Sequence, residues 1–184
     1  MTNIRSVLAT FAVAAFAQPV LAAGQTVVAS GIVSAASIDS LTEMSAAAAI
    51  GFHVNRFASV GVELTSVPDV GDDGRAAMFT TNVRVDIPAI GARLVPYVIG
   101  GGGVAHVRDT VAITAADPVP GLPVVIPPRS VTESSTALAL TGGGGASVLV
   151  ADHVSIDIDL RYMRLLAARD RNMGRFGIGF SYRF

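Results

Sequence analysis

The 184-residue chain contains no cysteine, which excludes disulfide bonds, thiolate nucleophiles and cysteine-rich zinc sites. It also contains no lysine, since all 13 basic residues are arginine. This absence excludes Schiff-base catalysis and the lysine-containing phosphate loop of many nucleotide-binding proteins. The net charge of −1 at pH 7 provides no field that would attract a polyanion, so we expect no nucleic-acid partner.

Charged residues are also scarce, at 15% of the chain, whereas hydrophobic residues make up 51% and the mean hydropathy is +0.57. That composition is typical of a protein in contact with lipid. A membrane-spanning helix needs roughly 18 or more consecutive apolar residues. After the N-terminus, glycine clusters, proline, histidine or charged residues interrupt every such run. A closed β-barrel is the other structure that satisfies its backbone in lipid, so the composition favours a barrel.

The N-terminus has the three-part pattern of a secretory signal peptide. Arg5 supplies the positive charge, residues 6–17 form a short apolar segment, and small residues precede a cleavage site after Ala22. A retained membrane anchor is the alternative, but Gln18 and Pro19 interrupt the apolar segment. The predicted division is a signal peptide at residues 1–22 and a barrel domain at residues 23–184.

Apolar and polar residues alternate along most of the chain, which indicates strands with one apolar face. In residues 176–184 the apolar face is Phe176, Ile178, Phe180, Tyr182 and Phe184, and the intervening residues are Gly, Gly, Ser and Arg. Residues 154–162 alternate in the same way. The predicted strands cover residues 25–34, 43–54, 59–67, 76–87, 94–107, 135–150, 154–162 and 176–184, and the first has the weakest pattern.

The connections between these strands alternate in length. Tight turns are expected at 55–57, 88–93 and 151–153, and generally longer loops at 35–41, 68–75, 108–134 and 167–173. This alternation is typical of a meander with its turns on one side of a membrane and its loops on the other. The predicted fold class is therefore all-β, an eight-stranded antiparallel up-and-down transmembrane β-barrel. Since the sequence ends at the last strand, we expect no appended peptidoglycan-binding module.

The bulky apolar rows are predicted to face lipid, because the interior of an eight-stranded barrel has room for side chains and little else. The aromatic residues also fall at two heights, as interfacial girdles do. Phe52, Phe57, Tyr97, Tyr182 and Phe184 are predicted near the turns, and Phe79, Tyr162 and Phe176 near the loops.

Two segments resemble a known family. The C-terminal part of the chain resembles the final hairpin of small outer-membrane β-barrels of Gram-negative bacteria, the OmpA-transmembrane and opacity-protein-like group. The residues that carry this resemblance are Arg161-Tyr162-Met163, then a charged loop, then Gly177-Ile178-Gly179-Phe180-Ser181-Tyr182-Arg183-Phe184. Residues 96–106 resemble that family's fifth strand, and the whole resemblance spans residues 43–184. It implies the outer membrane as location, with outer-membrane lipid and lipopolysaccharide as surroundings. It also implies that Phe180, Tyr182 and Phe184 form an assembly signal recognised by the barrel-assembly machinery.

The face opposite the lipid is predicted to hold a polar network with a structural role, since buried charges need partners and arginine bridges two carboxylates well. In the simplest register of the last hairpin, Asp157 lies across from Arg183. A proton pathway or ion site is the alternative. The predicted lumen residues are Glu63, Arg84, Asp86, Asp157, Asp159, Arg161, Arg175 and Arg183.

Two tetraglycine runs, at residues 100–103 and 142–145, lie on strands joined by the longest loop. Pairing Gly101 with Gly144 would place the runs side by side. A packing role is expected, either curvature or space for an arginine from a neighbouring strand. A groove for a partner or a lipid is the alternative.

Catalytic and metal sites are not indicated. His153 and Ser155 match the His-x-Ser of lipid A deacylases only superficially. In those enzymes a carboxylate completes the triad, but here His153 falls in a tight turn and no Asp or Glu lies between Asp159 and Asp170. His53 and His106 are predicted at opposite strand ends and so do not form a metal pair. The acidic residues Asp69, Asp72 and Asp73 are expected in a solvated loop rather than a calcium site. We therefore expect no enzyme activity, cofactor or metal.

The loop at residues 108–134 is the longest, and five prolines stiffen it. Loops of this length are uncommon without a function, so a surface or host partner is expected there. The leading hypothesis is a non-enzymatic envelope-structural or adhesin-like surface protein. A porin-like diffusion channel is the alternative, and a lipid-modifying enzyme is a third possibility.

Overall fold

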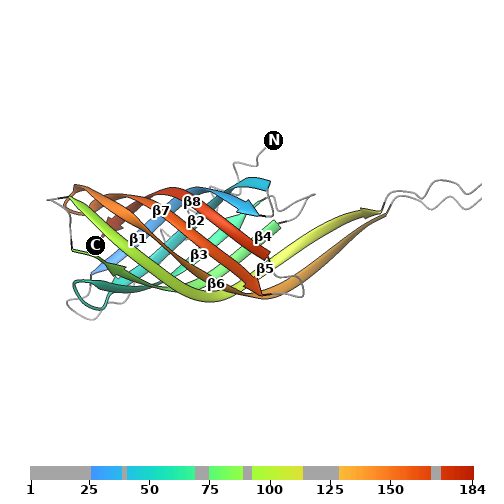
Figure 1. Ribbon diagram of the computed structural model, residues 1–184, viewed down its shortest axis with the longest axis horizontal. Helices are drawn as coiled ribbons and strands as arrows, with labels where there is room; N and C mark the ends of the chain where they lie inside the picture. Colours follow the sequence, from blue (N-terminus) through green and yellow to red (C-terminus); the bar gives the residue numbers. More distant parts are fainter. Residues whose placement is uncertain (1–25, 39–40, 69–74, 89–92, 114–128, 167–170) are drawn as a thin grey trace, which may run out of the picture.

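Eight strands pair in chain order and the last returns to the first, so the sheet closes into a barrel (Figure 1). The computed structural model describes residues 26–38, 41–68, 75–88, 93–113, 129–166 and 171–184. All neighbouring pairs are antiparallel, which confirms the predicted fold class. The strands are β1 (Val27–Ile38), β2 (Leu41–His53), β3 (Ala58–Val67), β4 (Arg75–Asp86), β5 (Leu94–Ile113), β6 (Arg129–Ala151), β7 (Val154–Leu166) and β8 (Arg171–Arg183).

The predicted signal peptide lies outside the described residues. Within the described ranges, no helix is long and apolar enough to cross a membrane.

Two predicted loops were wrong in length. Residues 35–41 were expected to form a loop, but β1 continues to Ile38 and pairs there with Leu41. The alternation continues through small residues, with Ser34 and Ala36 buried while Ala35 and Ser37 are exposed. The loop predicted at 108–134 is also shorter, because β5 and β6 continue their pairing to Ile113 and Arg129. Valine, threonine and serine dominate that extension, and such residues favour strands once a partner strand is present.

The apolar rows face outward, as predicted. Phe176, Ile178 and Phe180 on β8 are 54%, 58% and 52% exposed, whereas the residues between them face the interior. Tyr97 was predicted in the turn-side girdle, and this was wrong, because it points inward and is 4% exposed. Its parity was difficult to assign because glycines follow it on the same strand. The outward residue at that height is its neighbour Val98.

The interior changes character along the barrel axis. On β7 the inward residues run from Asp157, Asp159 and Arg161 to Met163 and Leu165 toward the loop side. Most other strands follow the same order, although β1 and β2 bury Ser34 and Ser45, so the loop-side half of the interior is mostly apolar. We call that half the apolar plug; it consists of Ala36, Val67, Ala76, Met78, Ala105, Val107, Ala137, Ala139, Met163, Leu165 and Met173.

The tetraglycine runs are offset rather than side by side, so the predicted pairing of Gly101 with Gly144 was wrong. Gly101 pairs with Thr141, and Gly100 with Gly142. The inward glycines lie against neighbouring backbone: a Cβ on Gly103 would lie 1.9 Å from the carbonyl oxygen of Phe79. These positions allow close strand approach and leave space for the interior side chains.

Adjacent glycines of the second run provide a matched test of this packing. A Cβ on Gly143 would lie 2.2 Å from the Leu160 carbonyl oxygen and 3.0 Å from Arg161 Cγ, whereas Gly142 has no atom within 4 Å of that position. We expect Gly143→Ala to lower the free energy of unfolding by about 1–3 kcal/mol, as overpacking does. Gly142→Ala should leave it nearly unchanged. Urea titrations in detergent micelles would measure both, and equal midpoints for the two variants would argue against steric packing.

Candidate functional site

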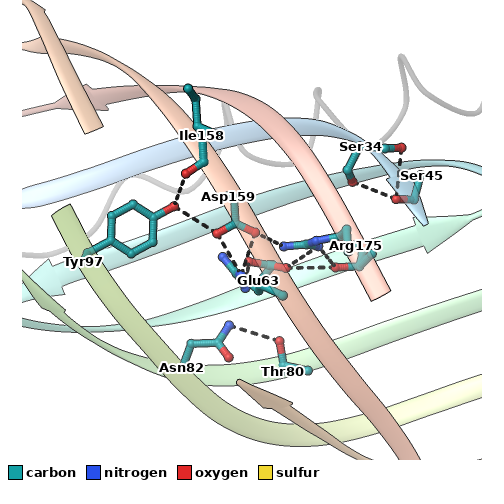
Figure 2. Close-up of polar contacts among 11 residues, drawn as sticks. Ser34, Ser45, Glu63, Thr80, Asn82, Tyr97, Ile158, Asp159 and Arg175 are labelled. Atoms are coloured by element: carbon teal, nitrogen blue, oxygen red, sulfur yellow. Dashed lines mark hydrogen bonds and ion pairs between the residues drawn. The ribbon is translucent and has the colours of Figure 1, made fainter. Parts of the chain in front are cut away.

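Four fully buried charged residues meet at the middle of the interior (Figure 2). We call Glu63, Asp159, Arg161 and Arg175 the central quartet. The Glu63 carboxylate accepts from both arginines, with Oε2 2.7 Å from Arg161 Nη1 and Oε1 2.8 Å from Arg175 Nη1. Asp159 Oδ1 lies 2.9 Å from Arg161 Nε and 3.2 Å from Arg175 Nη2. Two anions and two cations therefore alternate in a closed ring without net charge.

The strand register brings these charges together. Arg161 on β7 and Arg175 on β8 are direct cross-strand partners, an arrangement that would be repulsive alone. Glu63 reaches them from β3 and bridges both guanidinium groups. Arginine suits this position because its planar fork donates in several directions.

The register also overturns one predicted contact. Asp157 pairs with Gly179 rather than Arg183, and Asp159 pairs with Gly177. Glycine opposite each aspartate leaves space for the carboxylate in the narrow interior. Arg183 is exposed at the turn-side end and is not part of the central quartet.

Two uncharged residues add hydrogen bonds to the carboxylates of the quartet, while Arg175 Nε is buried without a partner among the described residues. Tyr97 Oη donates to Asp159 Oδ2 at 2.9 Å, and Thr65 Oγ1 donates to Glu63 Oε1 at 3.0 Å. Tyr97 fits because Gly145 has no side chain: a Cβ there would lie 2.6 Å from Tyr97 Oη. The sequence prediction missed both residues, although Thr65 has the same parity as Glu63 in its strand.

A second polar group lies nearer the turns. Asp157 accepts hydrogen bonds from Ser147 and Ser181, and no ion pair joins Asp157 to a cation in the described ranges. Arg84 Nε donates to Asp86 at 2.7 Å, and Arg84 Nη2 donates to Ser147 Oγ at 2.7 Å.

A cavity of about 110 Å³ lies among these turn-side residues. The guanidinium group of Arg84 stacks on Tyr97, 3.8 Å from the ring centroid, and so connects the turn-side group to the central quartet. The predicted lumen residues therefore divide into the central quartet, the pair Arg84 and Asp86, the serine-bonded Asp157 and the exposed Arg183.

The barrel is filled from the quartet to the plug. Arg175 and Asp159 are 0% exposed, and Met78, Met163 and Met173 in the plug are 1–2% exposed. An open pore would leave its lining residues in contact with water. The described part of the barrel therefore contains no continuous aqueous passage at these levels.

The three histidines lie apart from one another. His153 Nδ1 lies 3.0 Å from the Arg183 carbonyl oxygen, at the exposed turn. His53 lies inside near Asp86, at 3.7 Å, whereas His106 is exposed on the outside. Over the described residues, no three His, Asp or Glu side chains are placed to hold a metal ion. Asp69, Asp72 and Asp73 lie outside those residues.

The β5–β6 hairpin extends beyond the barrel wall (Figure 1). Pairing of β4 with β5 ends at Arg75 and Arg108, and pairing of β6 with β7 ends at Leu138 and Leu166. Among the described strands, residues 109–113 therefore pair only with β6, and residues 129–137 pair only with β5. Each of these segments presents an unpaired backbone edge.

Comparison with solved structures identifies the same architecture in outer-membrane proteins. Neisserial surface protein A is 16% identical, with a TM-score of 0.63 over 88% of this chain and 98% of its own. The attachment invasion locus protein Ail of Yersinia pestis is 14% identical, with a TM-score of 0.55 over 87% and 97% of the two chains. A major outer-membrane protein of Thermus thermophilus is 15% identical, with a TM-score of 0.55 over 85% and 99%.

The chain has the fold of the small eight-stranded outer-membrane β-barrels. No family model and no curated protein matches its sequence. The similarity therefore lies in the strand number, pairing and closure.

The central quartet can be tested by neutralising its shared anion. In Glu63→Gln, Arg161 and Arg175 keep only Asp159 as an anionic partner, leaving a buried positive charge uncompensated. We expect the free energy of unfolding to fall by about 3 kcal/mol or more, the usual result of breaking a buried pair. Glu43→Gln is the control, because Glu43 is half-buried on β2 and no ion pair is described for it. Equal unfolding midpoints for the two variants would mean that the quartet contributes little stability.

Proposed function

We propose that this chain is a non-enzymatic surface protein of the outer membrane, exported by the signal peptide at residues 1–22, whose β5–β6 hairpin contacts partners outside the cell. The projecting hairpin is the observation that carries this proposal. At about 3.3 Å per residue, the nine residues 129–137 extend about 30 Å from the point where β6 leaves the wall.

The lipid-facing surface supports the membrane location. Apolar side chains cover the outside of every strand, while charged residues are concentrated in the interior and at the ends. The outward row Phe180, Tyr182 and Phe184 fits the assembly signal expected from the family resemblance, because all three side chains are accessible to another protein. We therefore retain the barrel-assembly machinery as a partner during biogenesis.

The filled interior supports an external role rather than transport. Among the described residues, the side chains of the central quartet and the apolar plug are buried and fill the interior at their levels. The polar lumen network is accordingly proposed to be structural. The unpaired hairpin edges, in contrast, offer backbone donors and acceptors to an extended segment of another protein. One of the structural relatives is named for attachment and invasion, which fits an adhesive role.

The hairpin can be shortened without disturbing the barrel. Arg108 and Ser134 are direct partners, so residues 109–133 can be replaced by Asn-Gly, the preferred two-residue hairpin turn. We expect this variant to assemble and to lose adhesion to host cells and surfaces, measured on bacteria with matched surface expression. Unchanged adhesion of those bacteria would overturn the proposed role.

A matched variant tests whether the paired strands matter. Ile113 and Arg129 are also partners, so replacing only residues 114–128 by Asn-Gly keeps the whole described ribbon. We expect adhesion to persist in this variant if the strand edges make the contact. Its loss in both variants would place the contact in residues 114–128 instead.

A further inference from the structure

The start of β4 lies beside the point at which β5 leaves the wall (Figure 1). A group of exposed polar side chains lies there. Arg75 and Arg108 are direct cross-strand partners, and Ser134 pairs with Arg108 from the other side. His106 and its partner Thr136 lie two residues nearer the membrane centre. All five side chains are exposed, and we call them the rim cluster.

The orientation of the rim cluster follows from the buried residues between its members. Ala76, Ala105 and Val107 are 4%, 0% and 6% exposed and face the interior. Because successive residues of a strand alternate between its faces, Arg75, His106 and Arg108 point away from the barrel.

Arg75 and Arg108 place two like charges at directly opposite positions of neighbouring strands. Directly opposite side chains in antiparallel strands have Cβ atoms about 4.5–5.5 Å apart, and like charges there are destabilising. No ion pair joins either guanidinium group to a carboxylate among the described side chains. Arg108 Nε donates to His106 Nε2 at 3.4 Å, and His106 Nδ1 lies 3.4 Å from Thr136 Oγ1. An anion between the arginines would convert this repulsion into attraction.

The height of the rim cluster indicates which anion is available. Phe79 and Val104 are cross-strand partners in the outward apolar belt, 48% and 51% exposed. Arg75 lies four residues beyond Phe79, which places it about 10 Å farther along the membrane normal for a strand tilted by about 40°. That is the level at which lipid headgroups begin.

We propose that the rim cluster binds a phosphate group carried by an outer-leaflet lipid; this rests on the outer-membrane location proposed above. The guanidinium fork matches two phosphate oxygens, so Arg75 and Arg108 can donate in parallel to one group. The hydroxyl groups of Ser134 and Thr136 provide further donors. The acyl chains would lie against the belt that contains Phe79 and Val104.

The test compares lipid binding by two double variants with equal charge loss. Protein extracted from membranes into a phosphate-free nonionic detergent is titrated with phosphorylated lipid A, and native mass spectrometry measures the bound fraction. Arg75→Gln/Arg108→Gln should bind at least about tenfold more weakly than the wild type, the loss expected from charge-assisted hydrogen bonds. Arg56→Gln/Arg93→Gln removes two exposed arginines on the turn side and should bind like the wild type.

Three results would overturn the proposal. The first is equal affinity of the rim variant and the turn-side control. The second is equally tight binding of lipid A whose phosphates have been removed enzymatically. The third is displacement of the lipid by millimolar inorganic phosphate, which would show that a free anion rather than a lipid is the ligand.

Thermal unfolding provides a readout that does not depend on the lipid. Without phosphate, Arg75→Gln/Arg108→Gln should unfold at the same temperature as the wild type or a higher one, because the like-charge contact is removed. A lower temperature would contradict the repulsion that motivates the site.

The variant lacking residues 109–133 keeps Arg75, Arg108 and Ser134. It should bind lipid A normally whether or not it loses adhesion. Failure of the lipid site is thereby distinguished from failure of the adhesive role.

Discussion

The alternating ring of two carboxylates and two guanidinium groups is the contact on which the interior of this barrel depends. Charges removed from water are costly unless each is paired and hydrogen-bonded. Glu63 meets this requirement by bridging Arg161 and Arg175, two arginines that otherwise face each other across β7 and β8. Asp159 closes the ring from the opposite side.

Several features of the sequence follow from accommodating that ring. The inward glycines on β5, β6 and β8 lie where a Cβ would meet neighbouring backbone or side-chain atoms. Tyr97 turns away from the lipid because its hydroxyl group donates to Asp159. The apolar plug then fills the loop-side half, so the barrel interior is a packed core with a polar middle. The long β5–β6 hairpin and the exposed pair Arg75 and Arg108 lie outside this core.

The period-two alternation predicted the strands and the barrel because an antiparallel strand with one face in lipid must alternate strictly, as residues 154–162 do. The alternation could not predict the register. The simplest register of the last hairpin predicted Asp157 across from Arg183, but the observed register places glycine opposite both Asp157 and Asp159. Glycine carries no hydrophobic signal, so a sequence pattern does not reveal its role in making space. The inward orientation of Tyr97 was missed for the same reason, because its neighbours along β5 include four glycines. The bonding of Ser147 and Ser181 to Asp157 was not predicted, because short hydroxyl residues are common on either face of a strand.

Charge alternation predicted an inward position for the central quartet and for Asp157, which are buried, and for Arg183, which is exposed, but it could not show whether these side chains close the interior. Whether Arg161 and Arg175 line a channel or fill it depends on Glu63 reaching them from β3, across the barrel. The loop predicted at residues 108–134 shows a different error, because the sequence pattern ended the two strands too early. Its prolines suggested a loop from residue 108 onward, whereas the paired threonine and valine residues on either side extend the strands well beyond the wall.

Single-channel recording in a planar lipid bilayer tests most directly whether the interior is closed. The protein should first be shown to be folded by its heat-dependent mobility on a gel. A lumen filled by the central quartet and the apolar plug predicts a flat baseline with no conductance steps at any applied voltage. Reproducible steps from the folded wild-type barrel would contradict it and would make a diffusion channel the better description of this protein.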